Sequence, residues 1–186
     1  MSFKHAIVRA PGKSFPAGLT SAELGAPDLA LAMRQHAAYC HALERCGVDV
    51  TMLEADERYP DSTFVEDVAV VSAGGAILTR PGAASRAGEV AAMRPALQKF
   101  FPTLAEILPP GTLDGGDVCD AGGQFFIGVS ARTNEDGAWQ LARWLEKFGH
   151  AATLVDIRRR PGLLHLKSGL AWLGGNRLAA WEAMAN

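Results

Sequence analysis

A pair of adjacent glycines recurs three times at nearly constant spacing, and each pair lies between two apolar runs. The pairs are Gly74-Gly75, Gly122-Gly123 and Gly174-Gly175, so successive pairs start 48 and 52 residues apart. Glycine supplies the positive φ angles of a tight hairpin, and each pair therefore predicts two paired strands. The predicted strands are 64–71 with 76–79, 118 with 125–129, and 166–172 with 178–181.

A helix and a single strand follow the first two hairpins. The predicted helices are 86–100 and 133–148, and a further helix, 28–46, precedes the first hairpin. Thr133 and Asp136 resemble a capping box, and Gly149 is typical of a helix C-terminus. Single strands are predicted at 48–53, 105–108 and 152–157. The repeating unit is thus ββαβ, with repeats at 62–110, 111–160 and 161–186.

Units of this kind usually form radial or solenoid arrays. We therefore expect an α/β fold in which residues 1–186 form one radial domain, with 4–54 contributing to closure of the ring. The third repeat stops after its hairpin, so we expect the array to be incomplete. Open strand edges predict self-association into a homo-oligomer.

Composition and charge exclude several classes of partner. The net charge is −2 with no basic block, and no apolar stretch reaches the length of a membrane span, so neither nucleic acid nor a membrane is an expected partner. The N-terminus has no apolar signal core. Three cysteines, Cys40, Cys46 and Cys119, are too few for a disulfide framework or a zinc site, which favours a cytoplasmic location. We expect Cys40 and Cys46, on the first helix, to be buried.

Charged residues precede each glycine pair. They are Glu66 and Asp67 in the first repeat, Asp114 and Asp117 in the second, and His165 in the third. In a radial array equivalent positions converge, so carboxylates and an imidazole would share one pocket. Such a pocket suits a planar cation, with histidine transferring protons.

Each of these features also has a simpler structural interpretation. The stretch from Asp114 to Asp117 is equally typical of a turn with side-chain hydrogen bonds, and His165 lies between two leucines, as a core histidine does. Two adjacent acids in the apolar strand 64–71 are harder to explain structurally, because buried acids are rarely unpaired. The shared repeat position favours a functional interpretation of all three.

Six motifs carry a resemblance to a known family, and together they span nearly the whole chain. The sequence resembles the dimethylarginine dimethylaminohydrolases, in the amidinotransferase-like (pentein) superfamily of five-bladed αβ propellers. Thr79–Gly82 and Arg132–Asn134 distinguish it from the arginine deiminases. The motifs are Leu19–Ser21, Pro60–Asp67, Thr79–Gly82, Leu113–Val118, Ser130–Asn134 and Leu164–Gly169.

The resemblance implies hydrolysis of Nω-methylated arginine to citrulline and methylamine or dimethylamine through a cysteine thiolate, without metal or cofactor. It implies that the substrate is a small molecule, and that the chain is a partial propeller without its last blade or blades. By family pattern Asp67 and Asp114 hold the guanidinium, and His165 is the general acid and then the base. The remaining substrate contacts would come from Arg86 and Arg132 at the carboxylate, Asp61 and the Leu19 backbone at the α-amino group, and Glu66 beside Asp67.

Two alternatives stay open at this point. One is an arginine deiminase or another guanidine hydrolase. The other is a non-catalytic module that binds arginine analogues.

The resemblance also calls for a nucleophilic cysteine, which in the family lies near the end of a longer chain. Cys119 follows Asp117 by two residues, deeper along the same strand, and is a poor candidate. We therefore predict that the purified 186-residue polypeptide releases no citrulline from dimethylarginine. A colorimetric citrulline assay measures this, and clear multiple turnover would contradict it.

Overall fold

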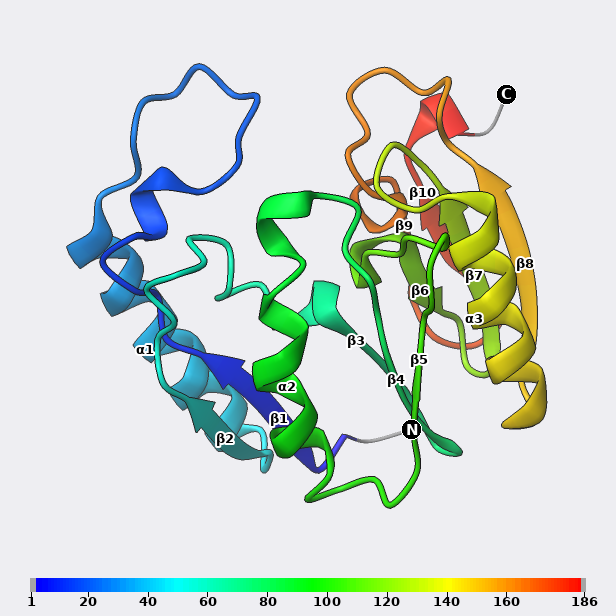
Figure 1. Cartoon of the computed structure of the whole chain (residues 1–186), viewed down its shortest axis with the longest axis horizontal. Helices are drawn as coiled ribbons and strands as arrows, with labels where there is room; N and C mark the ends of the chain where they lie inside the picture. The colour runs from blue at the N-terminus through cyan, green and yellow to red at the C-terminus, as the bar shows by residue number, and fades with distance from the viewer. Residues whose placement is uncertain (1–2, 185–186) are drawn as a thin grey trace. The chain divides into compact units, whose positions relative to one another are not determined.

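The computed structural model describes residues 3–184, which divide into two compact units (Figure 1). The N-terminal unit ends at Val65 and the C-terminal unit begins at Glu66. Each unit is considered by itself below.

The N-terminal unit is a parallel βαβ arrangement. Strands β1 (His5–Arg9) and β2 (Asp49–Leu53) pair in parallel with His5 opposite Asp49, and helix α1 (Leu29–Arg45) connects them. A single 3-10 turn, η1 (Phe15–Ala17), lies between β1 and α1. The Asp28 carboxylate caps α1 by accepting a hydrogen bond from the Leu31 N–H at 3.0 Å. The predicted helix 28–46 and strand 48–53 are therefore confirmed.

The cysteines of this helix differ in burial. Cys40 is buried, as expected, but Cys46 is exposed, so that part of the prediction was wrong. Cys46 is the C-cap residue, and Gly47 follows it with φ of 77°, which turns the chain away from the helix axis.

The C-terminal unit contains two complete ββαβ repeats and a third hairpin. The first repeat has β3 (Ala69–Ser72), β4 (Gly75–Leu78), α2 (Glu89–Leu97) and β5 (Leu104–Glu106). The second has β6 (Val118–Asp120), β7 (Gln124–Val129), α3 (Glu135–Lys147) and β8 (Ala151–Asp156). The third hairpin pairs β9 (Leu170–Trp172) with β10 (Leu178–Ala180), and a 3-10 turn, η6 (Glu182–Met184), follows it.

The pairing pattern is the same in both complete repeats. The two hairpin strands are antiparallel, and the strand after the helix pairs in parallel with the second of them, in the orders β3-β4-β5 and β6-β7-β8. The glycine pairs form the hairpin turns, with φ of 79° and 101° at Gly122 and Gly123. The ββαβ repeat predicted from the glycine spacing is therefore confirmed.

A one-turn 3-10 helix precedes the first strand of each hairpin, which the sequence did not predict. These turns are η2 (Val65–Val68), η4 (Gly115–Asp117) and η5 (Leu166–Ser168). The predicted strands 64–71 and 166–172 therefore begin too early. In η2 successive side chains point about 120° apart, so Asp67 is buried while Glu66 is exposed. The expectation that both acids are buried in a strand was therefore wrong for Glu66, which is exposed, whereas Asp67 is buried but lies in the 3-10 turn.

The helix boundaries also differ from the prediction at their N-termini. Helix α3 is capped by Asn134, which accepts a hydrogen bond from the Gly137 N–H at 2.8 Å, and not by Thr133. The Thr133 hydroxyl instead donates to Asp117. Helix α2 starts only at Glu89, because Arg86 ends a separate 3-10 turn, η3 (Ala84–Arg86). Gly149, with φ of 83°, ends α3 as predicted.

The main core of the C-terminal unit lies between the sheets β3-β4-β5 and β6-β7-β8 and helix α3. Ala138, Leu141 and Leu145 recur at helical spacing and present one buried face of α3, which runs along β7 and β8 (Figure 1). Burial of a large apolar side chain contributes roughly 1.5–3 kcal/mol, so this face anchors the second repeat. The other buried members of the cluster are Val70, Ile77, Ala105, Ile107, Leu113, Val118, Phe125, Ile127 and Val129.

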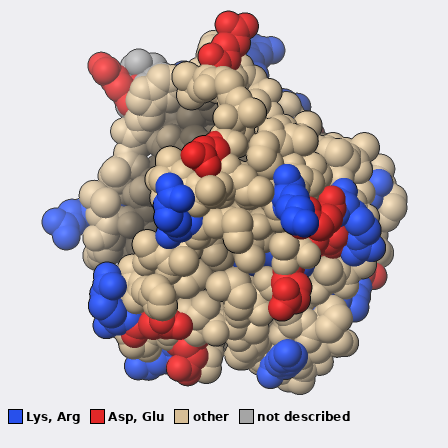
Figure 2. All heavy atoms as spheres, turned by 90° about the vertical axis from the view of Figure 1, so that its left-hand side faces the viewer, with Lys and Arg blue, Asp and Glu red and all other residues tan. Residues whose placement is uncertain are grey.

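The surface carries charges of both signs. On the face in Figure 2, Lys and Arg side chains alternate with Asp and Glu, and no area carries one sign alone. None of the helices in residues 3–184 combines the length and the apolar character needed to cross a bilayer.

Close approach between the first two repeats depends on Gly115. A Cβ added there would lie 2.0 Å from the backbone oxygen of Glu66, which cannot move aside as a side chain can. We predict that Gly115→Ala lowers the free energy of unfolding by roughly 3 kcal/mol or more, at the upper end of overpacking costs, measured by urea denaturation.

Gly149→Ala is the control for this experiment. It adds a Cβ in open space at a positive φ, so only the left-handed backbone conformation should cost free energy, roughly 1–2 kcal/mol. Equal losses for the two variants would contradict the steric explanation.

Candidate functional site

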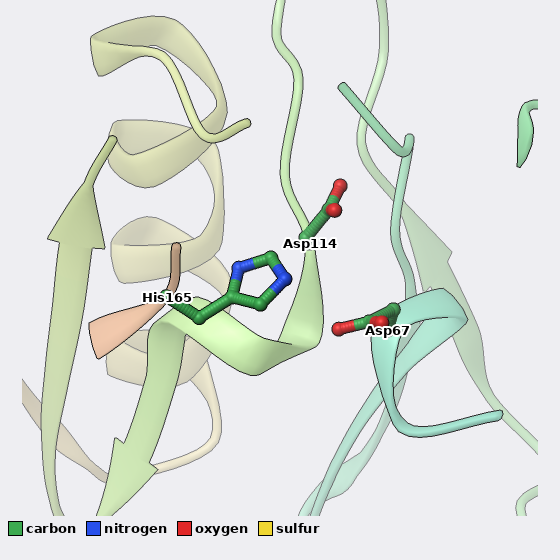
Figure 3. Close-up of side chains that lie close together, drawn as sticks. All are labelled: Asp67, Asp114 and His165. Atoms are coloured by element: carbon green, nitrogen blue, oxygen red, sulfur yellow. The ribbon is translucent and has the colours of Figure 1, made fainter. Parts of the chain in front are cut away.

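Asp67, Asp114 and His165 come together in the C-terminal unit. One nitrogen or oxygen atom from each side chain lies within 4.8 Å of those of the other two. Asp67 belongs to η2, whereas Asp114 and His165 are the N-cap residues of η4 and η5. In Figure 3 the edge of the His165 ring that bears one nitrogen faces the two acids. The convergence of these three residues was an expectation of the repeat analysis, and the structure places them accordingly.

The Asp67 carboxylate is held by two donors. Oδ2 accepts a hydrogen bond from Arg86 Nη1 at 2.6 Å, and Oδ1 accepts one from the Gly116 N–H at 2.9 Å. The Asp67 backbone oxygen also accepts a bond from the Thr79 hydroxyl. Bonds from two directions restrict both the position and the plane of this carboxylate.

Arg86 is a buried arginine with two carboxylate partners. Besides Asp67 it contacts Glu89, to which Nη2 donates at 2.8 Å. Burial alone would lower the pKa of Arg86, but Glu89 and Asp67 outweigh it and raise that pKa. This arrangement suits an arginine that orients Asp67, so binding of a substrate carboxylate by Arg86 stays a prediction from the family pattern. Glu89 had no signal in the sequence beyond its place in a helical segment.

Asp114 is fully buried and only half satisfied. Oδ1 accepts a hydrogen bond from the Gly82 N–H at 2.8 Å, but Oδ2 is buried without a hydrogen-bond partner among the described residues. Burial raises the pKa of Asp114, and the charge of Asp67 adds to this effect against the opposing bond from Gly82. An uncompensated carboxylate oxygen is costly, so this atom is suited to receive a donor from a ligand.

The charge of His165 is set by three acids. Burial would lower the pKa of His165, but Asp117, Asp67 and Asp114 together raise it above its usual value. The Nδ1 atom lies 3.6 Å from Asp117 Oδ2. A raised pKa favours the protonated ring, which is the form that can give up a proton.

Asp117 is the residue that sequence reasoning left without a role. It is fully buried, and it accepts hydrogen bonds from the Ser130 and Thr133 hydroxyls, each at 2.7 Å, and from the Leu166 N–H at 3.0 Å. The signal in the sequence was its place three residues after Asp114 in the second repeat. These bonds also explain the Ser130–Asn134 motif, whose Asn134 caps α3.

The two glycines between Asp114 and Asp117 allow close approach. Neither has a positive φ. A Cβ at Gly116 would lie 2.8 Å from the His165 ring and 2.9 Å from Asp67 Oδ1. Because Gly116 has no side chain, the imidazole ring of His165 can lie directly against its backbone.

The other predicted residues lie in different surroundings. Glu66 is exposed and pairs with Lys167 at 2.6 Å. Arg132 is half-buried, and its guanidinium has no hydrogen bond or ion pair within residues 3–184. In the N-terminal unit, the Leu19 N–H donates to both Asp61 oxygens at 3.1 and 3.2 Å.

Cys119 does not have the environment of a reactive thiol. It is buried in β6 within a small apolar cluster, opposite Phe126. Burial raises the pKa of the Cys119 thiol, which disfavours the nucleophilic thiolate. This agrees with the expectation that Cys119 is a poor candidate for the nucleophile.

Comparison with known proteins identifies close relatives. The N(G),N(G)-dimethylarginine dimethylaminohydrolase of Pseudomonas aeruginosa is 49% identical over 179 residues, covering 96% of this chain and 69% of the relative. The protein of the same name from Streptomyces coelicolor is 37% identical over 174 residues, covering 93% of this chain and 66% of the relative. The chain thus spans about two thirds of the length of these relatives. No family model matches it.

Solved structures confirm the fold. A cysteine-to-serine variant of the Pseudomonas aeruginosa enzyme, complexed with citrulline, superimposes with a TM-score of 0.93 at 48% identity, over 97% of this chain and 70% of that one. A dimethylarginine dimethylaminohydrolase adduct with S-methyl-L-thiocitrulline gives 0.92 at 47% identity, over 96% and 70%. The predicted α/β propeller class is therefore correct.

The raised pKa of His165 predicts a pH-dependent contribution to stability. A group whose pKa is higher in the folded state stabilises the fold fully below its unfolded value, about 6.5, and this contribution is lost as pH rises through the folded value. We predict that the difference in unfolding free energy between the wild type and His165→Gln is larger at pH 6 than at pH 9. Urea denaturation at both pH values measures it, and a constant difference would contradict the prediction.

Proposed function

The chain belongs to the dimethylarginine dimethylaminohydrolase family, and we propose that its site serves the hydrolysis of Nω-methylated arginines to citrulline and methylamine or dimethylamine, with a nucleophilic cysteine that is not among its three cysteines. The observation that carries the proposal is the unpartnered, buried Oδ2 of Asp114, which shares one space with Asp67 and His165. A guanidinium is planar, positively charged and rich in N–H donors, so it matches two carboxylates at this separation.

The two acids would divide the recognition of the guanidinium between them. Asp114 Oδ2 would accept one N–H, and Asp67, already fixed by Arg86 and Gly116, would present its oxygens to the same cation. Because both carboxylates are held before a ligand arrives, little conformational entropy would be lost on binding. Holding the guanidinium plane also orients its carbon for attack, which in favourable cases contributes about 7–11 kcal/mol.

The proposed chemistry is a two-step hydrolysis. A cysteine thiolate adds to the guanidinium carbon, the carbon–nitrogen bond to the methylated nitrogen breaks, and His165 supplies the proton with which the amine leaves. Water then adds to the same carbon, His165 takes a proton from it, and citrulline and the thiolate are released. The net reaction consumes one water. The citrulline and thiocitrulline ligands of the related structures belong to the class of molecule that this site would hold.

The remaining contacts concern the amino-acid part of the substrate. Arg132 is a suitable carboxylate partner because its guanidinium has no internal acid in the described region. We propose that Arg86 acts through Asp67. Contact of Leu19 and Asp61 with the α-amino group, support from Glu66, and a cytosolic location stay predictions.

Ligand binding tests the recognition step. In Asp114→Asn the amide oxygen would keep the Gly82 bond, so the NH2 group would face the ligand and oppose its N–H donors. We expect the affinity for Nω,Nω-dimethylarginine, measured by isothermal titration calorimetry, to fall tenfold or more, since a hydrogen bond to a charged group contributes about 1.5–3 kcal/mol.

Asp136→Asn is the matched control, because Asp136 is an exposed acid on α3. Its affinity should equal that of the wild type. Unchanged binding in Asp114→Asn would overturn the proposed guanidinium site. Hydrolysis itself is measured as citrulline formed by a protein that carries these residues together with the nucleophilic cysteine, and absence of citrulline from every methylated arginine would refute the activity.

A further inference from the structure

Asp67 and Asp117 occupy the same place in successive repeats. Each is the third residue of its 3-10 turn, η2 or η4. Each accepts, through Oδ1, a backbone N–H from the turn of the next repeat, 49 residues further along the chain: Gly116 at 2.9 Å and Leu166 at 3.0 Å. Asp67 belongs to the candidate cation site, whereas Asp117 is next to it, 3.6 Å from His165 Nδ1.

Asp117 differs from Asp67 in what its second oxygen contacts. Oδ2 accepts bonds from Ser130 and Thr133 and lies 3.6 Å from His165 Nδ1. That nitrogen is buried and has no hydrogen-bond partner within the described residues, so the carboxylate oxygen is its polar neighbour. The separation is just outside hydrogen-bond length, and catalytic contacts of this kind often shorten when a ligand binds.

The proton on the neutral His165 ring can be placed from these contacts. If Nδ1 were unprotonated, its lone pair would face an anionic oxygen in a buried environment, with no donor to compensate. A proton on Nδ1 removes this repulsion and provides a donor for Oδ2. The ring nitrogen farther from the backbone, Nε2, then has a free lone pair, and Figure 3 places it on the side of Asp67 and Asp114.

We propose that Asp117 is a positioning residue that holds neutral His165 in the Nδ1–H tautomer, with Nε2 directed at Asp67 and Asp114. The inference rests on the proposed function: the doubly protonated ring would give its Nε2 proton to the departing amine, and the resulting neutral Nδ1–H form would take a proton from water through the same nitrogen. Gly116 also restricts the ring, since a Cβ there would lie 2.8 Å from the His165 ring atoms Cγ and Cδ2. Asp117 therefore acts through His165 and does not itself face the pocket.

The first test needs no substitution in the site. In a histidine-15N-labelled chain, long-range 1H–15N correlation spectra distinguish the two neutral tautomers, and His165→Gln identifies which signals belong to His165. We expect the Nδ1–H form to predominate at high pH. Predominance of the Nε2–H form would overturn the proposal even if every Asp117 variant failed to fold.

The second test separates positioning from structural support. Asp117→Asn removes the negative charge of residue 117. Ser130→Ala removes one hydroxyl donor to Asp117 but keeps the charge of Asp117. Both should lower the urea midpoint, but only Asp117→Asn should lower the His165 titration midpoint and mix its tautomers. If the His165 titration midpoint were unchanged in Asp117→Asn, or shifted equally in Ser130→Ala, Asp117 would have only a structural role.

Both readouts concern the ring and not the ligand. If the tautomer and titration results hold while dimethylarginine does not bind, the proposed function fails and the positioning of His165 stands. If dimethylarginine binds while neutral His165 is in the Nε2–H form, the inference about Asp117 fails alone.

Discussion

The arrangement of the candidate site depends on one repeated hydrogen bond, from a backbone N–H of one 3-10 turn to a carboxylate in the turn before it. Asp67 accepts it from Gly116, and Asp117 accepts it from Leu166. Because each bond joins two turns, it sets the spacing between successive repeats. The residues at the starts of those turns, Asp114 and His165, are thereby directed into one space. Site geometry and packing of the repeats are thus established by the same contacts.

Close backbone approach makes this spacing attainable. Gly115 allows the Glu66 carbonyl to lie against η4, and Gly82 lies so close to the Arg132 backbone that a Cβ would be 2.2 Å from its oxygen. Gly82 also donates its N–H to Asp114. The glycines of these two motifs are therefore required by tertiary contact, in contrast to the hairpin glycines, several of which adopt positive φ angles.

The electrostatics of the site follow from an imbalance of charge. The two buried acids of the site, Asp67 and Asp114, share Arg86 as a positive neighbour. Arg86 also pairs with Glu89. One oxygen of Asp114 is thus left without a partner within the described chain, and the pKa of that acid is raised by burial. A cation with several N–H donors would relieve both conditions, which is the physical basis for proposing a guanidinium as the ligand.

The sequence by itself determined the repeat and the identity of the converging groups. Hairpins, helices and parallel strands follow from glycine pairs and apolar spacing, which are local properties, and the motifs indicated Asp67, Asp114 and His165. Only the tertiary structure decided that Asp67, and not its neighbour Glu66, is buried. It also decided that Asn134 and not Thr133 caps α3, that Arg86 pairs with Asp67, and that Asp117 lies next to His165 Nδ1. These outcomes depend on contacts between residues up to about 50 positions apart, where donors in one repeat meet acceptors in the next, and local propensity carries no information about such partners.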